Sequence, residues 1–291
     1  MKFFPLLAIF CAAFLSSAHA QVNAVTVELT LDQEQYLANE DMRVGVKVIN
    51  LSGQPISLGT DNEWLSFTVQ ARDQFVVSQL SEIPVKGEFS VPSSKQAIKR
   101  LNLTPYFDFR QPGRYQITAK VKIAQWDKEI TSHPLTFDIV MGTKLKEFDF
   151  GVPSNSTNAA PEIRRYILQQ ATFLRQMRLY LRLTDDTGSK VFRVFPLAPM
   201  TSFSNPEAQV DKTSNLHVLN QTGAKSFSYT VVNPNGEIIK QETHDYSNTR
   251  PVLRSNAEGN ILVVGGTLRL TSNAVPKLST PQSPEKDAEK H

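Results

Sequence analysis

Apolar and polar residues alternate in several short stretches of the first half of the chain. Every second residue is apolar over 25–31, and the pattern returns over 42–50. A period of two is typical of strands that bury one face. We predict further strands over 64–71, 97–103, 113–123 and 135–141.

Turn-forming residues separate these stretches. Gly53 and Pro55 close the strand that ends at residue 50, and Pro112 and Gly113 precede the strand over 113–123. About seven short strands with turn signals between them are typical of an antiparallel β-sandwich. We therefore predict such a sandwich over residues 25–141.

Two segments of this region resemble bacterial immunoglobulin-like and fibronectin-III-like modules. The first runs from Tyr36 to Met42 and leads into a strand that ends in the turn 50–56. The second is 111–119, where Pro-Gly turns the chain before Tyr115. The buried cysteine pair of antibody domains is absent, as is a central tryptophan at the antibody-domain spacing. The resemblance implies a spacer or a binding surface and specifies no activity.

A linker and a helix are expected next. Residues 142–160 have the composition of a linker, most clearly over 151–158. After Pro161, which suits a first helical turn, apolar residues stand at 163, 167, 173 and 174. This spacing predicts one short helix over 161–174.

The most basic stretch of the chain begins in this predicted helix. Such charges are ordinary on a solvated face. The functional interpretation is an anion-contacting patch. Its members are Arg164, Arg165, Arg175, Arg178 and Arg182.

An internal repeat marks the last third of the chain. Residues 206–219 align without gaps on 251–264, a shift of 45 positions. A hairpin is predicted before each segment, with turns at 185–188 and 233–236 whose residues tolerate positive φ. The repeat predicts that Leu216 and Val218 share the environment of Ile261 and Val263, with His217 on the opposite face.

This unit of hairpin, strand, turn and strand resembles one blade of a β-propeller, and 255–263 resembles the turn and strand of secreted NHL-like or sialidase-type propellers. Propellers close with about 4 to 8 blades, and the sequence holds two units. Either two blade-like sheets pack face to face, or several chains complete a ring. We favour the first and expect residues 161–272 to hold the helix and both repeats.

The N-terminus has the order of a signal peptide over residues 1–20. Lys2 precedes an apolar run over 3–15, and Ala18-His19-Ala20 forms a cleavage site. The run is shorter than the roughly 18 residues of a membrane span. We expect export to the periplasm or the exterior, most readily of a Gram-negative bacterium.

Composition excludes several kinds of chemistry in the mature chain. Cys11, the only cysteine, lies within the predicted signal peptide, which leaves no disulfide, catalytic thiol or cysteine-bound zinc. The formal net charge of +3 does not require nucleic acid or another polyanion as partner. The composition of 273–291 predicts a disordered tail.

No residue pattern identifies a catalytic, cofactor or metal site. The histidines His133, His217, His244 and His291 lack the close spacing of zinc ligands. Oxygen-bearing side chains in the repeat turns suit calcium, but hydrogen-bonded turns use the same residues. These are Asp211, Asn256 and Glu258.

Three functions remain. Two β domains without catalytic motifs favour a noncatalytic binding or assembly protein, with a protein or polysaccharide partner in the cell envelope. A carbohydrate-active enzyme or accessory protein, and a periplasmic chaperone, are the alternatives. Converging carboxylates in a deep pocket favour the enzyme, whereas an exposed edge strand with a basic pocket favours the chaperone.

Overall fold

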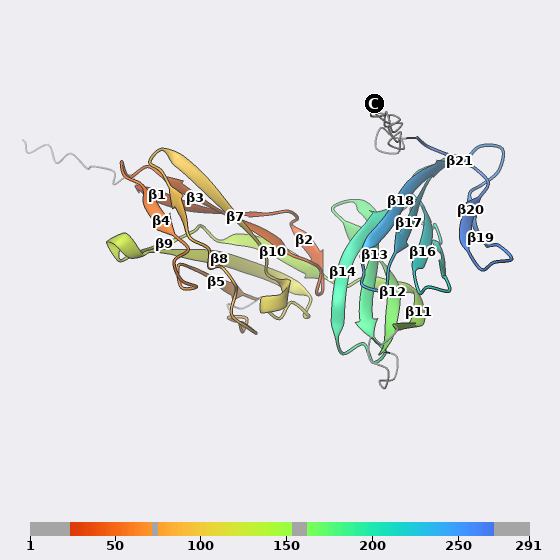
Figure 1. The fold of residues 1–291 in the computed structure, drawn as a ribbon, viewed down its shortest axis with the longest axis horizontal. Helices are drawn as coiled ribbons and strands as arrows, with labels where there is room; N and C mark the ends of the chain where they lie inside the picture. Colours follow the sequence, from red (N-terminus) through yellow and green to blue (C-terminus); the bar gives the residue numbers. More distant parts are fainter. Residues whose placement is uncertain (1–23, 72–74, 153–161, 271–291) are drawn as a thin grey trace, which may run out of the picture.

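The structure is a computed structural model that describes residues 24–71, 75–152 and 162–270. The predicted signal peptide (1–20) and tail (273–291) lie outside these residues. Within the described ranges the chain is mainly β, and its helical segments are two 3-10 turns, Thr104–Tyr106 and Ala124–Trp126. Figure 1 shows the two halves of the chain lying end to end along the long axis.

Two sheets build the first half. One has the order β1-β3-β7, formed by Val25–Leu31, Arg43–Asn50 and Lys95–Asn102. The other has the order β2-β10-β8-β5, formed by Gln35–Leu37, Leu135–Val140, Gly113–Ile123 and Leu65–Gln70, with β9 (Lys128–Thr131) on β8. A small pair joins β4 (Ile56–Leu58) to β6 (Phe89–Val91). β2 is parallel to β10, and the other pairs are antiparallel.

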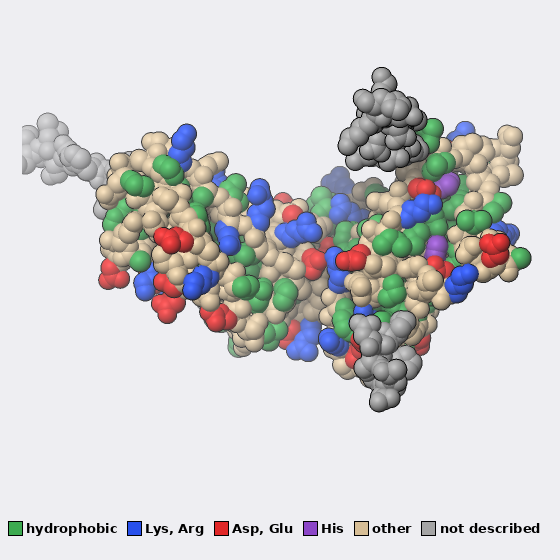
Figure 2. Space-filling model, viewed as in Figure 1, with side chains coloured by type: hydrophobic (Ala, Val, Ile, Leu, Met, Phe, Trp, Pro, Cys, Tyr) green, Lys and Arg blue, Asp and Glu red, His purple; other side chains and the backbone are tan. Residues whose placement is uncertain are grey.

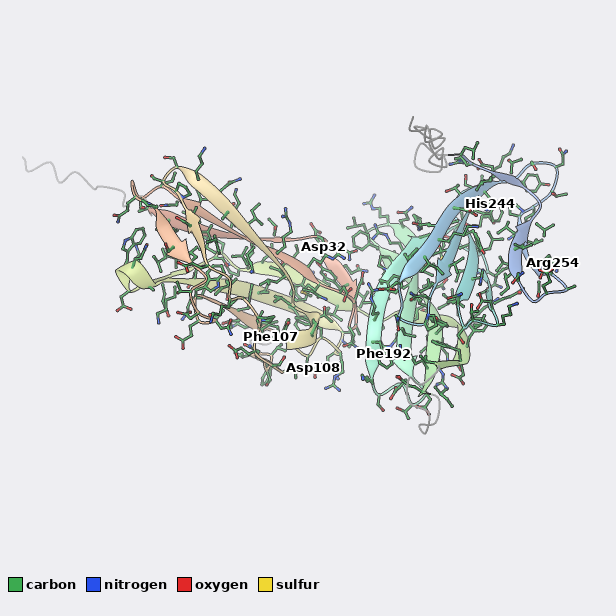
Figure 3. All side chains as sticks on the ribbon, in the orientation of Figure 1. Asp32, Phe107, Asp108, Phe192, His244 and Arg254 are labelled. Carbon is green, nitrogen blue, oxygen red and sulfur yellow. The ribbon has the colours of Figure 1, made fainter. Side chains whose placement is uncertain are left out.

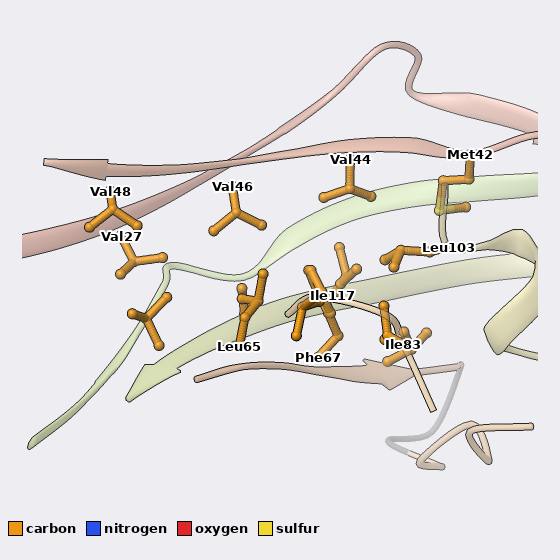
Figure 4. Close-up of a cluster of buried hydrophobic side chains, with 14 of the residues drawn as sticks. Val27, Met42, Val44, Val46, Val48, Leu65, Phe67, Ile83, Leu103 and Ile117 are labelled. Atoms are coloured by element: carbon orange, nitrogen blue, oxygen red, sulfur yellow. The ribbon is translucent and has the colours of Figure 1, made fainter. Parts of the chain in front are cut away.

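The core of this half lies between its two sheets. Val44, Val46 and Val48 of β3 face Leu65 and Ile117 of the other sheet (Figure 4). Alternation explains the arrangement, because every second residue of a strand points to the same face. The Tyr115 hydroxyl donates to the carbonyl oxygen of Gln111 at 2.7 Å and ties the start of β8 to the preceding turn.

Two larger antiparallel sheets and a terminal hairpin build the second half. The first sheet has the order β11-β12-β13-β14, formed by Thr143–Val152, Glu162–Phe173, Gln176–Asp185 and Val191–Pro199. The second has the order β15-β16-β17-β18-β21, formed by Glu207–Val210, Leu216–Gln221, Ser226–Val232, Ile238–Asp245 and Thr267–Leu268. The terminal hairpin joins β19 (Val252–Ser255) to β20 (Ile261–Val264).

These two sheets share a core. Tyr166, Leu181 and Leu183 of the first sheet pack in one cluster with Leu216 and Val218 of the second. The predicted face of Leu216 and Val218 is therefore correct. Val218 is 1% exposed, whereas its counterpart Val263 is only partly buried in a different cluster, so the two environments are not the same.

The predicted helix over 161–174 is wrong, because Glu162–Phe173 forms β12. β12 lies between β11 and β13 and pairs with both along its length. Tyr166 and Leu168, two residues apart, are both fully buried, which is the period of a strand. Tertiary pairing on both edges decides the conformation over the weak preference of the isolated segment.

Most of the predicted linker is also a strand. Thr143–Val152 forms β11, in which Phe148, Phe150 and Val152 alternate with Glu147 and Asp149. The Ser- and Asn-rich composition that suggested a linker belongs to the connection after β11, and residues 153–161 lie outside the described part. The change from the first half to the second therefore falls near Gly142.

The two halves touch through a small apolar cluster. Leu37 of β2 packs with Ala171, Tyr180 and Val194 of the first sheet of the second half. The Asp41 backbone N–H donates to the Val194 carbonyl oxygen at 3.3 Å. One face of the sheet β11-β12-β13-β14 thus packs against the second sheet of the same half, and its other face contacts the first half.

The two repeat segments form hairpins with the same register. Ala208 pairs with Val218 in one and Leu253 with Val263 in the other, 45 positions later. The Asp211 Oδ1 atom accepts the Asn215 N–H at 2.8 Å. The Asn256 Oδ1 atom accepts the Asn260 N–H at the same distance. The hairpins predicted around 185–188 and 233–236 are confirmed as β13–β14 and β17–β18.

Candidate functional site

The arginines predicted as an anion-contacting patch lie in several places. Arg164 and Arg165 point to opposite faces of β12, as neighbouring strand residues do. Arg164 pairs with Glu162 and also donates to the Pro234 carbonyl oxygen, both at 3.0 Å. Arg165 pairs with Asp149. Figure 2 shows charges of both signs interspersed on the visible face.

The other arginines lie at or near the junction of the halves. The Arg178 guanidinium stacks over the Phe173 ring, 3.8 Å from its centroid, and donates to the Gln33 side chain. Arg182 donates to the Ala38 carbonyl oxygen at 3.2 Å. Arg175 lies in the turn between β12 and β13. The structure therefore brings Arg178 and Arg182 to the junction and separates them from Arg164.

The terminal hairpin β19–β20 packs against the outer face of the second sheet, at the end of the molecule farthest from the first half (Figure 1). Its inner residues Leu253 and Ile261 are buried with Phe227 and Tyr229. On its outer face Leu262 is 51% exposed, and Figure 3 marks Arg254 on the same hairpin. The inner side of the hairpin thus covers the apolar residues of β17, and its outer side exposes Leu262.

One edge of β19 is occupied by a side chain. The Leu253 N–H donates to the Glu207 carboxylate at 2.9 Å, so it points away from β20. Antiparallel pairs alternate between hydrogen-bonded and non-hydrogen-bonded, and Leu253 with Val263 is accordingly a non-hydrogen-bonded pair. The Val263 N–H and C=O therefore point away from β19, as do those of Ile261.

The first repeat hairpin shows what the equivalent outward N–H and C=O groups of β16 bind. Val218, the counterpart of Val263, pairs across with Thr230 of β17, and Leu216 pairs with Val232. Within the described ranges, β20 pairs with β19 alone. The outer edge of β20 is therefore an open strand edge at the position where β16 binds β17.

A buried polar network lies on the sheet face beneath the hairpin. His217 contacts the Tyr229 hydroxyl through Nδ1 at 2.7 Å and Asp211 through Nε2 at 3.1 Å. Burial raises the pKa of Tyr229 to about 12, and the charges of Glu242 and Asp211 act in the same direction. Both ring nitrogens of His217 have partners, which accounts for its burial.

Asp211 stays ionised in this network. Burial by itself raises the pKa of a carboxyl group, but hydrogen bonds from His217, Asn215 and Thr213 outweigh it, and the Asp211 pKa lies well below its ordinary range. Both Asp211 and Asn256 use their oxygens to close turns. No group of three or more His, Cys, Asp or Glu suited to a metal ion occurs in the part of the chain that the structure describes.

Two carboxylates line one shallow cavity of the first half. Glu34 and Asp138 share a space of about 300 Å³ with Arg114. Arg114 forms a two-point ion pair with Asp138, at 2.9 and 3.1 Å, which lowers the pKa of that carboxyl group. Asp138 is thus held as a paired anion, which does not suit a general acid.

Sequence reasoning missed both the open edge of β20 and a cavity of about 220 Å³ at the junction of the halves, which Arg182 and Gln169 of the second half line together with residues of the first. A signal for the edge is the repeat itself: the first repeat segment is followed by the hairpin 227–242, whereas among the described residues the second is followed by the two-residue strand β21 (Thr267–Leu268). No local signal marks the junction, because its residues come from distant segments. No helix among the described residues has the length and apolarity to cross a membrane.

Comparisons with known proteins identify no family for this chain. The sequence matches no protein-family model, and it has no significant similarity to a curated protein. Among solved structures it is similar to the sporulation control protein Spo0M from Bacillus subtilis, at 7% identity and a TM-score of 0.30, over 60% of this chain and 90% of that one. A likeness of this size defines neither a shared fold nor a shared activity.

Proposed function

We propose that this protein is an exported, noncatalytic binding or assembly protein that takes up an extended segment of a partner protein along β20. The observation that carries the proposal is the open edge at Ile261 and Val263, where the equivalent strand β16 binds β17. Backbone groups on such an edge are hydrogen-bonding sites for an added strand.

The repeat defines how the added strand pairs. It runs antiparallel to β20 and exchanges backbone hydrogen bonds with Ile261 and Val263, as Val232 and Thr230 of β17 do with Leu216 and Val218. Side chains of a strand alternate between faces. Every second residue of the segment then shares the apolar inner side of the hairpin, which favours segments with apolar residues at alternate positions.

The composition of β20 also favours this function. Edge strands of soluble proteins are ordinarily protected by charges or proline. The edge strand β7 carries Lys95, Lys99 and Arg100, and the edge strand β11 carries Lys144 and Lys146. The strand β20 has the sequence Ile-Leu-Val-Val, without charge or proline.

The open edge of β20 also favours a propeller-type architecture for the second half. We infer that its sheets are propeller-type blades, with two complete antiparallel sheets and a third begun by β19–β20. The shared register and turns of the repeat hairpins favour this. The first half then serves as an immunoglobulin-like spacer. A periplasmic chaperone also binds by strand addition, and it differs in releasing the bound segment to a third protein.

The test is selection of binding peptides from a displayed library of random decamers, using the full mature chain. We expect enriched peptides with alternating apolar residues, and loss of binding when their backbone nitrogens are methylated at alternate positions. Val263→Pro removes only an outward N–H and should abolish binding, and Leu262→Lys should weaken it at least tenfold.

Ile98→Lys is the matched control, because Ile98 is an exposed apolar residue (43%) on the edge strand β7. It should leave peptide binding unchanged. If no peptide prefers the natural chain to Val263→Pro, or if methylated peptides bind equally well, strand addition at β20 is excluded.

A further inference from the structure

A cavity of about 220 Å³ lies where the two halves meet. The first half and the connection after it contribute Leu37, Ala38, Asn39, Arg110, Met141 and Gly142. The second half contributes Gln169 of β12 and Arg182 of β13. Since one water occupies roughly 30 Å³ in the liquid, the space holds a small ion together with some of its water.

Arg182 brings a positive charge to this cavity without a matching negative one. Its guanidinium has several N–H donors, and among the described residues it makes one hydrogen bond, to the neutral Ala38 carbonyl oxygen at 3.2 Å. No ion pair of Arg182 occurs in the described part of the chain. Burial lowers the pKa of Arg182, and no charged group counters that shift. A desolvated charge without a partner is unfavourable.

The acidic groups of the junction have other partners. The Glu40 carboxylate accepts hydrogen bonds from the Leu37 N–H at 2.7 Å and from the Gln33 side chain at 2.9 Å. Asp41 accepts one from Asn102 at 3.0 Å and faces Arg193. Neither lines the cavity.

The other polar lining groups also suit an anion. Arg110, at the rim, is a second guanidinium, and it is held by the Asp108 carboxylate on one side. Asn39 and Gln169 carry side-chain amides with N–H donors. None of the side chains that line the cavity is acidic.

We propose that this cavity binds a small oxyanion, a phosphate, sulfate or carboxylate group, with Arg182 as its principal ligand. Arginine suits such groups because its planar fork matches two oxygens at once. The bound anion touches residues of both halves and so strengthens their junction. This site is separate from β20, and the inference does not depend on the proposed strand addition.

The experiment measures anion binding to the full mature chain by isothermal titration calorimetry and by thermal unfolding. Sodium phosphate, sulfate, acetate and glucuronate are compared with sodium chloride at equal ionic strength, which removes general screening. We expect at least one oxyanion to bind and to raise Tm above the value in chloride. The order of affinities distinguishes tetrahedral anions from carboxylates.

Arg182→Gln should reduce the affinity at least tenfold, and Arg182→Lys should reduce it less because it keeps the charge without the fork. Arg165→Gln is the matched control, since Arg165 lies on the same sheet but is paired with Asp149 outside the cavity. The inference is overturned if no oxyanion is distinguished from chloride, or if the Arg182 variants bind as well as the Arg165 variant. If Arg182→Gln does not fold, the comparison of Arg182→Lys with Arg165→Gln decides in the same way.

Discussion

At the scale of single residues, the junction holds a carboxyl group with an unusual proton affinity. Glu40 is 3% exposed, and burial raises its pKa to about 7 although Leu37 and Gln33 donate hydrogen bonds that act in the opposite direction. The ordinary value is 4.5. Between these two pKa values the folded chain holds a proton that the unfolded chain has released.

Folding is therefore linked to pH through Glu40. Its favourable contribution is complete below about pH 4.5 and is lost as the pH rises through about 7. We predict that the free energy of unfolding, measured in urea, decreases from pH 5 to pH 8. Glu40→Gln should flatten this dependence, because the amide does not titrate in this range. An equal slope in both proteins contradicts the assignment to Glu40.

At the scale of elements, the two repeat hairpins provide a matched comparison. Their turns have the same hydrogen bonds to the Oδ1 atoms of Asp211 and Asn256. Only Asp211 also reaches a buried partner, His217. Positive φ at Ser214 (65°) and Gly259 (78°) completes the common turn geometry.

Replacing Asp211 and Asn256 by alanine distinguishes the stability contributed by the turn from that contributed by the contact with His217. Asp211→Ala should destabilise the chain by about 1–3 kcal/mol more than Asn256→Ala, because it leaves a buried histidine nitrogen without its partner. Urea unfolding at neutral pH measures both. Equal losses for the two variants indicate that the contact between Asp211 and His217 contributes nothing beyond the turn.

At the scale of the whole molecule, the position of the boundary between the halves determines which fragments can fold independently. Among the described residues, the core of the first half ends at Ile139. β11 belongs to the second half, because it pairs along β12. The connection between the halves is therefore short and lies around Met141, which is 67% exposed.

We predict that a fragment of residues 21–142 folds cooperatively by itself, as measured by circular dichroism and calorimetry. Cleavage within 153–161 should leave the two products associated, because β11 remains paired with β12. Gel filtration after such cleavage tests this. A fragment without a cooperative thermal transition contradicts an independent first half.

Local signals were sufficient for much of the fold. The period of two identified β3, β5, β7, β8 and β10, and turn residues located the hairpins. The gapless repeat indicated that β15–β16 and β19–β20 share one register. These features depend on residues a few positions apart, so the local residue pattern is enough to predict their side-chain alternation and their turn hydrogen bonds.

Features that join distant segments were decided by the tertiary structure. β12 is a strand because β11 and β13 pair with both its edges, although its own spacing suited a helix. His217 is buried on the sheet face where Leu253 and Ile261 of the β19–β20 hairpin pack. The outer edge of β20 is open among the described residues because the strand that follows it, β21, pairs with β18 instead. Arg182 meets Ala38 across 144 positions. Such contacts depend on which surfaces the fold brings together, and the local pattern around each residue does not contain that information.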